Sequence, residues 1–167
     1  RLVGLTRDAN LTLSPTFIPF LPWTTPKVYL DLLRLLAVLE LVDYVAPVQL
    51  SIRLLVPEGS RLLVIPEMQQ HLGHLDATAL SYRWTYLDPS TDVLQRQVHR
   101  AVEAGEALGC NRREIFTEVW RLANEACGLN APDLEASDPS DAPIHVPRLS
   151  EPWYCCAEPT ESQLTEI

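Results

Sequence analysis

The chain has 167 residues, which is enough for one compact domain with a hydrophobic core. Its 22 acidic residues outnumber the 13 basic ones, and the net charge of -9 repels phosphate backbones, so we expect no nucleic-acid binding. No apolar run reaches the roughly 18 to 20 residues that a membrane-spanning helix requires, so we expect no membrane span. The first residues show neither an initiator Met nor a secretory signal, which predicts that the chain begins within a longer protein.

The cysteines are too few for a secreted disulfide scaffold and lack the C-x-x-C spacing of zinc ribbons. They are Cys110, Cys127, Cys155 and Cys156. This usage predicts a reducing, cytoplasmic environment. Glycine-rich phosphate loops and G-x-S-x-G and H-E-x-x-H motifs do not occur in the sequence, so a catalytic centre would lie upstream of this chain.

Residues 11–20 combine β-branched and aromatic side chains in alternation, which predicts a strand. Pro15 and Pro19 cannot donate hydrogen bonds to a neighbouring strand, so this strand is expected at a sheet edge or with an irregularity. Thr25 and Pro26 then supply an N-cap hydroxyl and a proline suited to the first position of a helix.

Apolar side chains recur at helical spacing after this cap, which predicts a heavily buried helix. The stripe consists of Val28, Leu32, Leu35, Leu36 and Leu39, widened by Leu30, Leu33 and Val38.

Residues 47–56 alternate between apolar and mostly polar side chains, which predicts a second strand. Its polar face would present Gln49, Ser51 and Arg53. In a barrel this face would point to the interior, where it suggests a ligand. In an antiparallel sheet it would face water, and periodicity alone favours neither arrangement. The order strand, capped helix, strand favours a parallel unit and so the barrel-like interpretation.

The next segment holds shorter predicted elements. A small helix is expected from Pro66 to about Leu72, and residues 81–87 fit either a strand or a loop. His71 and His74 lie three apart, which would put both imidazoles on one helical face and could present two nitrogens to a metal. With no third ligand nearby they are more simply surface histidines.

Two helices are predicted further along the chain. The first runs from Pro89 to about Leu108, with Val93, Leu94, Val98, Ala101 and Val102 turned inward. The second begins at Asn111, which forms a capping box with Glu114, and ends near Gly128.

The end of the chain differs in composition from the rest. Residues 129–152 are rich in proline and acidic side chains and predict a flexible linker. Residues 153–167 begin with Trp153, Tyr154 and the adjacent thiols Cys155 and Cys156. A disulfide between adjacent cysteines closes a strained eight-membered ring that is easy to reduce, so this pair suits redox switching, soft-metal binding or electron transfer.

Four strings resemble the C-terminal region of the CUAEP/CCAEP-tail radical S-adenosylmethionine (SAM) proteins. They are PTFIPFLPWTT, PVQLSIRLLVPEGSRLL, LSYRWTYLDP and, most specifically, WYCCAEPT. The second tail position holds Cys156 where some relatives have selenocysteine. The resemblance implies an α/β fold, the C-terminal part of a partial (β/α) barrel, followed by two helices and a flexible cysteine tail. It divides the chain into barrel elements (1–88), a helical extension (89–128), the linker (129–152) and the tail (153–167).

The same resemblance implies the chemistry of a larger protein. Three upstream cysteines would hold a [4Fe-4S] cluster that cleaves SAM reductively, and an upstream domain similar to cobalamin-binding domains would precede them. Gln49, Ser51 and Arg53 would lie near SAM or a small-molecule or peptide substrate, and Cys155 and Cys156 would be the reactive thiols. The present chain would bind no cofactor stably and would be inactive without its partner, the upstream half of the same polypeptide. Two alternatives stay open, a non-enzymatic thiol or metal-binding module and a helical interaction domain.

Overall fold

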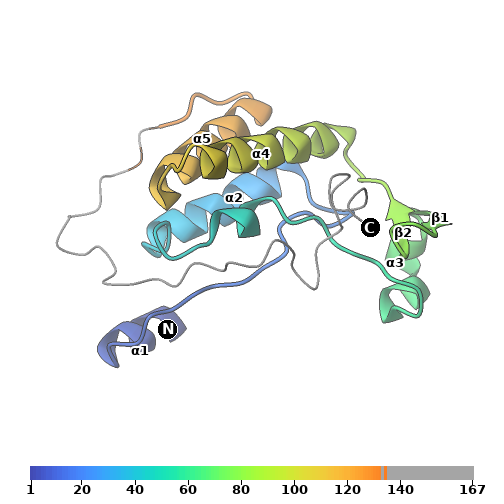
Figure 1. The fold of residues 1–167 in the computed structure, drawn as a ribbon, viewed down its shortest axis with the longest axis horizontal. Helices are drawn as coiled ribbons and strands as arrows, with labels where there is room; N and C mark the ends of the chain where they lie inside the picture. Colours follow the sequence, from blue (N-terminus) through green and yellow to red (C-terminus); the bar gives the residue numbers. More distant parts are fainter. Residues whose placement is uncertain (133, 135–167) are drawn as a thin grey trace.

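The computed structural model describes residues 1–132 and residue 134 (Figure 1). Within them the fold mixes α-helices with a small antiparallel sheet. In chain order the elements are α1 (Leu2–Asp8), α2 (Pro26–Val38), η1 (Pro47–Leu50), η2 (Arg61–Val64), α3 (Pro66–Gln69), β1 (Leu72–Asp76), β2 (Ser81–Trp84), α4 (Pro89–Ala107) and α5 (Arg112–Ala126). None of these helices is long and apolar enough to cross a membrane.

Helices α2, α4 and α5 pack against one another and form the body of the molecule (Figure 1). Their starts follow from local capping. At α2 the Thr25 hydroxyl accepts a hydrogen bond from the backbone N–H of Val28, and Pro26 occupies the first turn. At α5 Asn111 and Glu114 form the reciprocal capping box. The predicted starts of these helices are confirmed.

The buried face of α2 is narrower than the apolar stripe predicted. Tyr29, Leu30, Leu33 and Leu36 are buried, whereas Val28, Leu35 and Val38 are exposed. The expectation of a heavily buried helix is therefore wrong, because α2 is apolar on more sides than α4 and α5 cover.

Five residues of α4 were predicted to turn inward. Of these, Leu94, Val98 and Val102 are buried, whereas Val93 is exposed.

Neither long strand predicted in the first 60 residues forms. Residues 11–19 have no regular structure, and Pro47–Leu50 is a 3-10 helix. One isolated parallel bridge joins Phe20 to Arg53, with α2 between them in the chain. Proline accounts for part of this result, since it cannot donate to a strand ladder. The parallel connection itself is present, but in the described residues it lacks the further strands that would extend it into a barrel.

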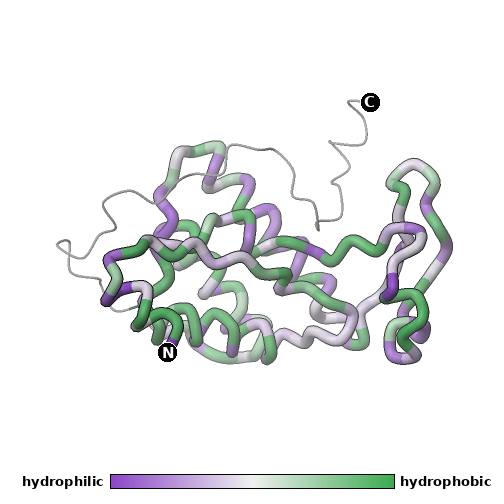
Figure 2. Tube along the Cα trace, turned by 90° about the horizontal axis from the view of Figure 1, so that it is seen from below, coloured by the Kyte–Doolittle hydropathy of each residue, from purple (hydrophilic) through white to green (hydrophobic). Residues whose placement is uncertain are grey.

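Elements η2, α3, β1 and β2 form a lobe that stands out from the helical body (Figures 1 and 2). Strands β1 and β2 pair antiparallel, with Leu72 opposite Trp84 and Asp76 opposite Ser81. The ambiguous segment 81–87 thus begins as a strand. The small helix ends at Gln69, before the predicted Leu72, because the chain turns into β1.

This arrangement also separates the two histidines predicted to share a helix face. His71 follows the end of α3, and His74 lies within β1. Their placement on one helical face is therefore wrong, because the helix stops before it reaches them.

A single hydrophobic cluster joins the predicted barrel elements to the predicted helical extension. It includes Phe20 and Val56 from the first 88 residues and Leu94 and Phe116 from the next 40, all of them buried. Residues 1–88 and 89–128 therefore share one core.

Candidate functional site

Gln49 and Ser51, predicted to line a ligand site, are buried and bonded to the backbone around them. The Gln49 side-chain oxygen accepts a hydrogen bond of 3.0 Å from the backbone N–H of Phe17. The Ser51 hydroxyl donates one of 3.0 Å to the carbonyl of Val48. Both groups thus anchor loops that lack a strand partner, and neither lines the groove described below.

Arg53 lies on a small aromatic cluster. Its guanidinium carbon is 3.9 Å from the centre of the Trp84 ring and 5.4 Å from that of Tyr86, close enough for cation–π attraction. It also donates a hydrogen bond of 2.5 Å to the carbonyl of Trp84. In turn the Trp84 indole N–H donates to the carbonyl of Leu54. The contacts hold β2 and the segment after it against the loop at residue 53.

Gln49, Ser51 and Arg53 occur close together in the sequence, but the structure brings them into different surroundings. The first two are enclosed by backbone, whereas the third packs on Trp84 and Tyr86. Their predicted contact with SAM or substrate stays a prediction.

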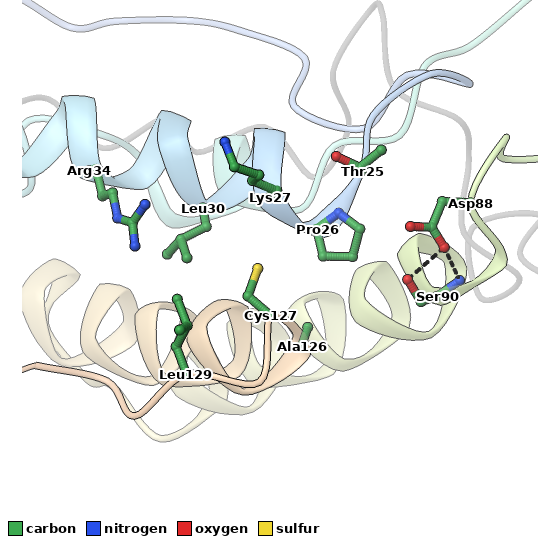
Figure 3. A pocket seen from close by; sticks show the side chains of 10 residues that line it. All are labelled: Thr25, Pro26, Lys27, Leu30, Arg34, Asp88, Ser90, Ala126, Cys127 and Leu129. Carbon is green, nitrogen blue, oxygen red and sulfur yellow. Dashed lines mark hydrogen bonds between the residues drawn. The ribbon is translucent and has the colours of Figure 1, made fainter.

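A groove with a volume of about 530 Å³ lies between α2, the end of α5 and the start of α4 (Figure 3). This size is within the range of small-ligand sites. Apolar side chains line much of it, namely Pro26, Leu30, Ala126 and Leu129. The Cys127 side chain directs its sulfur from the end of α5 toward α2 (Figure 3).

Two cations of α2, Lys27 and Arg34, border this groove. Both form salt bridges with Asp31, at 3.3 Å and 3.1 Å. Because one carboxylate serves two cations, these three side chains together keep one positive charge, which the carboxylate of Asp88 in the groove lining offsets. Partial burial raises the pKa of the Cys127 thiol and Asp31 adds to the effect, while Arg34 and Lys27 oppose it. At neutral pH Cys127 is therefore a protonated thiol that reacts slowly with free reagents.

Cys127 is one of the four cysteines of the sequence, but it was not among the predicted site residues. One local signal was present, since Cys127 directly precedes Gly128, where α5 was expected to end. The C-cap position leaves the side chain at the helix end and beside α2. What the sequence did not reveal is which helix packs there.

Cys155 and Cys156, the thiols predicted to react, lie outside the described residues. Among residues 1–132 and 134, no group of three or more His, Cys, Asp or Glu side chains is placed to hold a metal ion. Cys110 and Cys127 are both free thiols. Comparisons of the chain with protein-family models, curated proteins and solved structures find no match.

Proposed function

We propose that this chain is the C-terminal part of a radical SAM enzyme with a CCAEP-type tail. In this proposal a [4Fe-4S] cluster held upstream supplies the electron for SAM cleavage, and Cys155 and Cys156 have a redox or metal-binding role. The single observation that carries it is the sequence WYCCAEPT at residues 153–160, in which adjacent thiols follow two aromatic side chains.

The connection through α2 supports the proposal. Phe20 and Arg53 run parallel, with backbone hydrogen bonds of 3.3 Å and 3.0 Å from Phe20 N–H to Ile52 and from Leu54 N–H to Phe20. A helix between two parallel segments is the repeating unit of (β/α) barrels. An upstream half of the polypeptide would supply the remaining strands.

The described residues do not themselves fit the implied cofactors. No cluster-ligating group is present among them, and the Gln49 and Ser51 side chains bond to nearby backbone. We therefore assign them no step in SAM cleavage. The residues that hold the cluster and most of SAM would belong to the upstream half.

The full-length protein, reconstituted with iron and sulfide under anaerobic conditions, tests this proposal. With a strong reductant it should convert SAM to 5′-deoxyadenosine, measured by chromatography. Replacing the cysteines of an upstream C-x3-C-x2-C motif with alanine should abolish the product. A coding sequence without such a motif would contradict the proposal.

The role of the tail needs a separate variant. If Cys156 takes part in turnover, Cys156→Ser should lower the rate at least about tenfold, a barrier increase of about 1.4 kcal/mol. Cys110→Ser, at a cysteine that does not line the groove, is the matched control and should leave the rate unchanged. Equal rates for both variants would remove the tail from catalysis.

An interaction domain is the second candidate, and the exposed apolar face of α2 favours it. This face carries Val28, Leu35 and Val38, which are 56%, 52% and 79% exposed. Among the described residues, α4 and α5 show no comparable stripe, since Val93 is the exposed large apolar side chain within them. Leu35→Ser should weaken co-purification with the upstream half, whereas Leu108→Ser, at a leucine after α4 that is 81% exposed, should not.

A further inference from the structure

We propose that the groove beside Cys127 is the docking site for residues 151–158 of this same chain, and that Cys127 exchanges disulfide bonds with the Cys155–Cys156 pair. The inference rests on the redox form of the proposed tail function. It does not depend on SAM chemistry.

The first argument is complementarity between the groove and the segment. Apolar side chains form part of the groove wall, and its charged lining residues are Lys27 and Arg34 on α2 and Asp88 before α4. Together with Asp31, which bridges the two cations, these side chains carry no net charge. Residues 151–158 read EPWYCCAE, with two aromatic side chains and two thiols between Glu151 and Glu158. Aromatic side chains bury a large apolar area, and Glu151 or Glu158 would meet Lys27 or Arg34 on the α2 side of the groove, away from Asp88.

The second argument is the path of the chain after α5. Leu129 lines the groove, and the Trp120 indole donates a hydrogen bond of 2.9 Å to the carbonyl of Pro132. Leu134 still packs against the core. The described chain therefore leaves the groove after Leu129 and passes Trp120, roughly 10 Å back along α5 from Cys127. At about 3.3 to 3.6 Å per residue, the 19 residues from position 134 to position 153 span at most about 65 Å, ample for a return.

The third argument is the position of the sulfur. Cys127 lines the groove and points across it (Figure 3). Cys110 directly precedes the N-cap Asn111, at the opposite end of α5. Only one of the two described thiols is thus placed to meet a docked segment. A docked disulfide has a high effective concentration at Cys127, and this proximity offsets the low thiolate fraction.

Once the tail disulfide has formed, its exchange with Cys127 needs no further oxidant. The Cys127 thiolate attacks one sulfur of the Cys155–Cys156 disulfide, so a bond forms between Cys127 and the tail while the bond between the adjacent sulfurs breaks. The electron pair leaves on the other tail sulfur, which takes up the proton that Cys127 released. The initial tail disulfide forms by exchange with oxidised glutathione, which becomes two glutathione thiols.

Disulfide mapping on the full chain tests the exchange. The reduced protein is treated with oxidised glutathione, quenched with an alkylating agent, digested with trypsin and analysed by mass spectrometry. We expect Cys127 to be linked to the tail at least about tenfold faster than Cys110. Cys110→Ser should leave this rate unchanged. Equal linkage of Cys127 and Cys110 would overturn the proposal.

Docking itself has a readout that needs no disulfide. In the reduced full chain, iodoacetamide should modify Cys127 several-fold faster after Trp153→Ala with Tyr154→Ala than in the parent, because the groove is then open. The modification of Cys110 should not change. An unchanged rate of Cys127 modification would overturn docking. A rate of disulfide linkage that rises in proportion to protein concentration would also overturn it, because a second copy would then supply the tail. Neither measurement involves SAM cleavage, so failure here and failure of the enzymatic proposal are distinguishable.

Discussion

Single polar side chains hold the irregular loops of this protein against its helices. The Tyr29 hydroxyl donates a hydrogen bond of 2.8 Å to the carbonyl of Leu50, and burial raises the pKa of this phenol. The Thr91 hydroxyl donates one of 2.9 Å to the carbonyl of Thr24. Buried backbone groups need partners, and here side chains supply part of what a neighbouring strand would supply.

Ser81 is an exception among the described residues, because its buried hydroxyl has no hydrogen-bond partner. Removing an unsatisfied buried hydroxyl removes its desolvation cost, so Ser81→Ala should stabilise the protein by about 1 kcal/mol. Ser60→Ala is the matched control, because Ser60 accepts a hydrogen bond from the Leu62 N–H at the start of η2. It should destabilise by about 1 kcal/mol. Urea unfolding measures both, and the same sign for both would contradict the assignment.

Asp76 makes the hairpin sensitive to acid. A hydrogen bond from Arg83 lowers the pKa of this carboxyl, and the backbone N–H groups of Ala79 and Thr78 lower it further. A lowered folded-state pKa means that this stabilisation is complete above the unfolded value of about 3.9 and is lost as the pH falls through the lower folded value. The protection of β1 amides from hydrogen exchange, taken relative to the intrinsic exchange rate at each pH, should therefore fall below about pH 4. Asp76→Asn should remove this acid response, and an unchanged response would contradict it.

At the scale of elements, α4 and α5 approach closely at Gly105. A Cβ atom at this position would lie 2.6 Å from Cγ1 of Ile115, which is buried. Helix propensity favours Ala over Gly by about 1 kcal/mol, but overpacking costs about 1 to 3 kcal/mol. Gly105→Ala should thus destabilise the protein by about 1 kcal/mol in thermal or urea unfolding.

The contact with Ile115 gives the control. In an Ile115→Ala background the same Gly105→Ala change should become stabilising, because the clash is gone and the propensity remains. Gly4→Ala in α1 should not destabilise either, since a Cβ there meets nothing within 4 Å. A destabilising Gly105→Ala in both backgrounds would place the cause elsewhere.

Helix ends were predictable from the sequence because their determinants are local. Thr25 with Pro26, and Asn111 with Glu114, fix helix starts within four residues. Strands were less predictable because they need a partner that the sequence pattern does not identify. Alternation in residues 47–56 reflects real burial of Leu54 and Val56, yet the segment forms isolated bridges at Arg53 and Leu54 and no continuous strand.

The candidate site was less predictable still. The groove forms where the end of α5 meets the first turns of α2, almost 100 residues earlier in the chain. No spacing rule connects Leu30 with Cys127, because their proximity depends on how the helices pack. The sequence does identify the tail thiols and their aromatic neighbours. The groove that we propose as their docking site depends on the tertiary structure.

At the scale of the whole molecule, the shared core determines how the protein should unfold. Helix α2 packs against both α4 and α5, and the core cluster crosses the boundary predicted between residues 88 and 89. Separating the two sides would expose Val56 and Phe116, both fully buried, to water. That cost favours one cooperative transition, as is usual for a body of this size.

Two tryptophans report on the two sides of that boundary. Trp84 and Trp120 are both buried, and Trp23→Phe with Trp153→Phe leaves them as the remaining indoles. In each variant that keeps only one of the pair, the urea midpoint by fluorescence should coincide with the midpoint that far-UV circular dichroism gives for the same variant. Val119→Ala, which truncates a fully buried side chain of α5, should lower both midpoints equally, by roughly 2 kcal/mol in stability. If Trp84 reported an earlier transition that Val119→Ala did not shift, residues 1–88 would unfold as a separate unit, and the shared core would not couple the two parts.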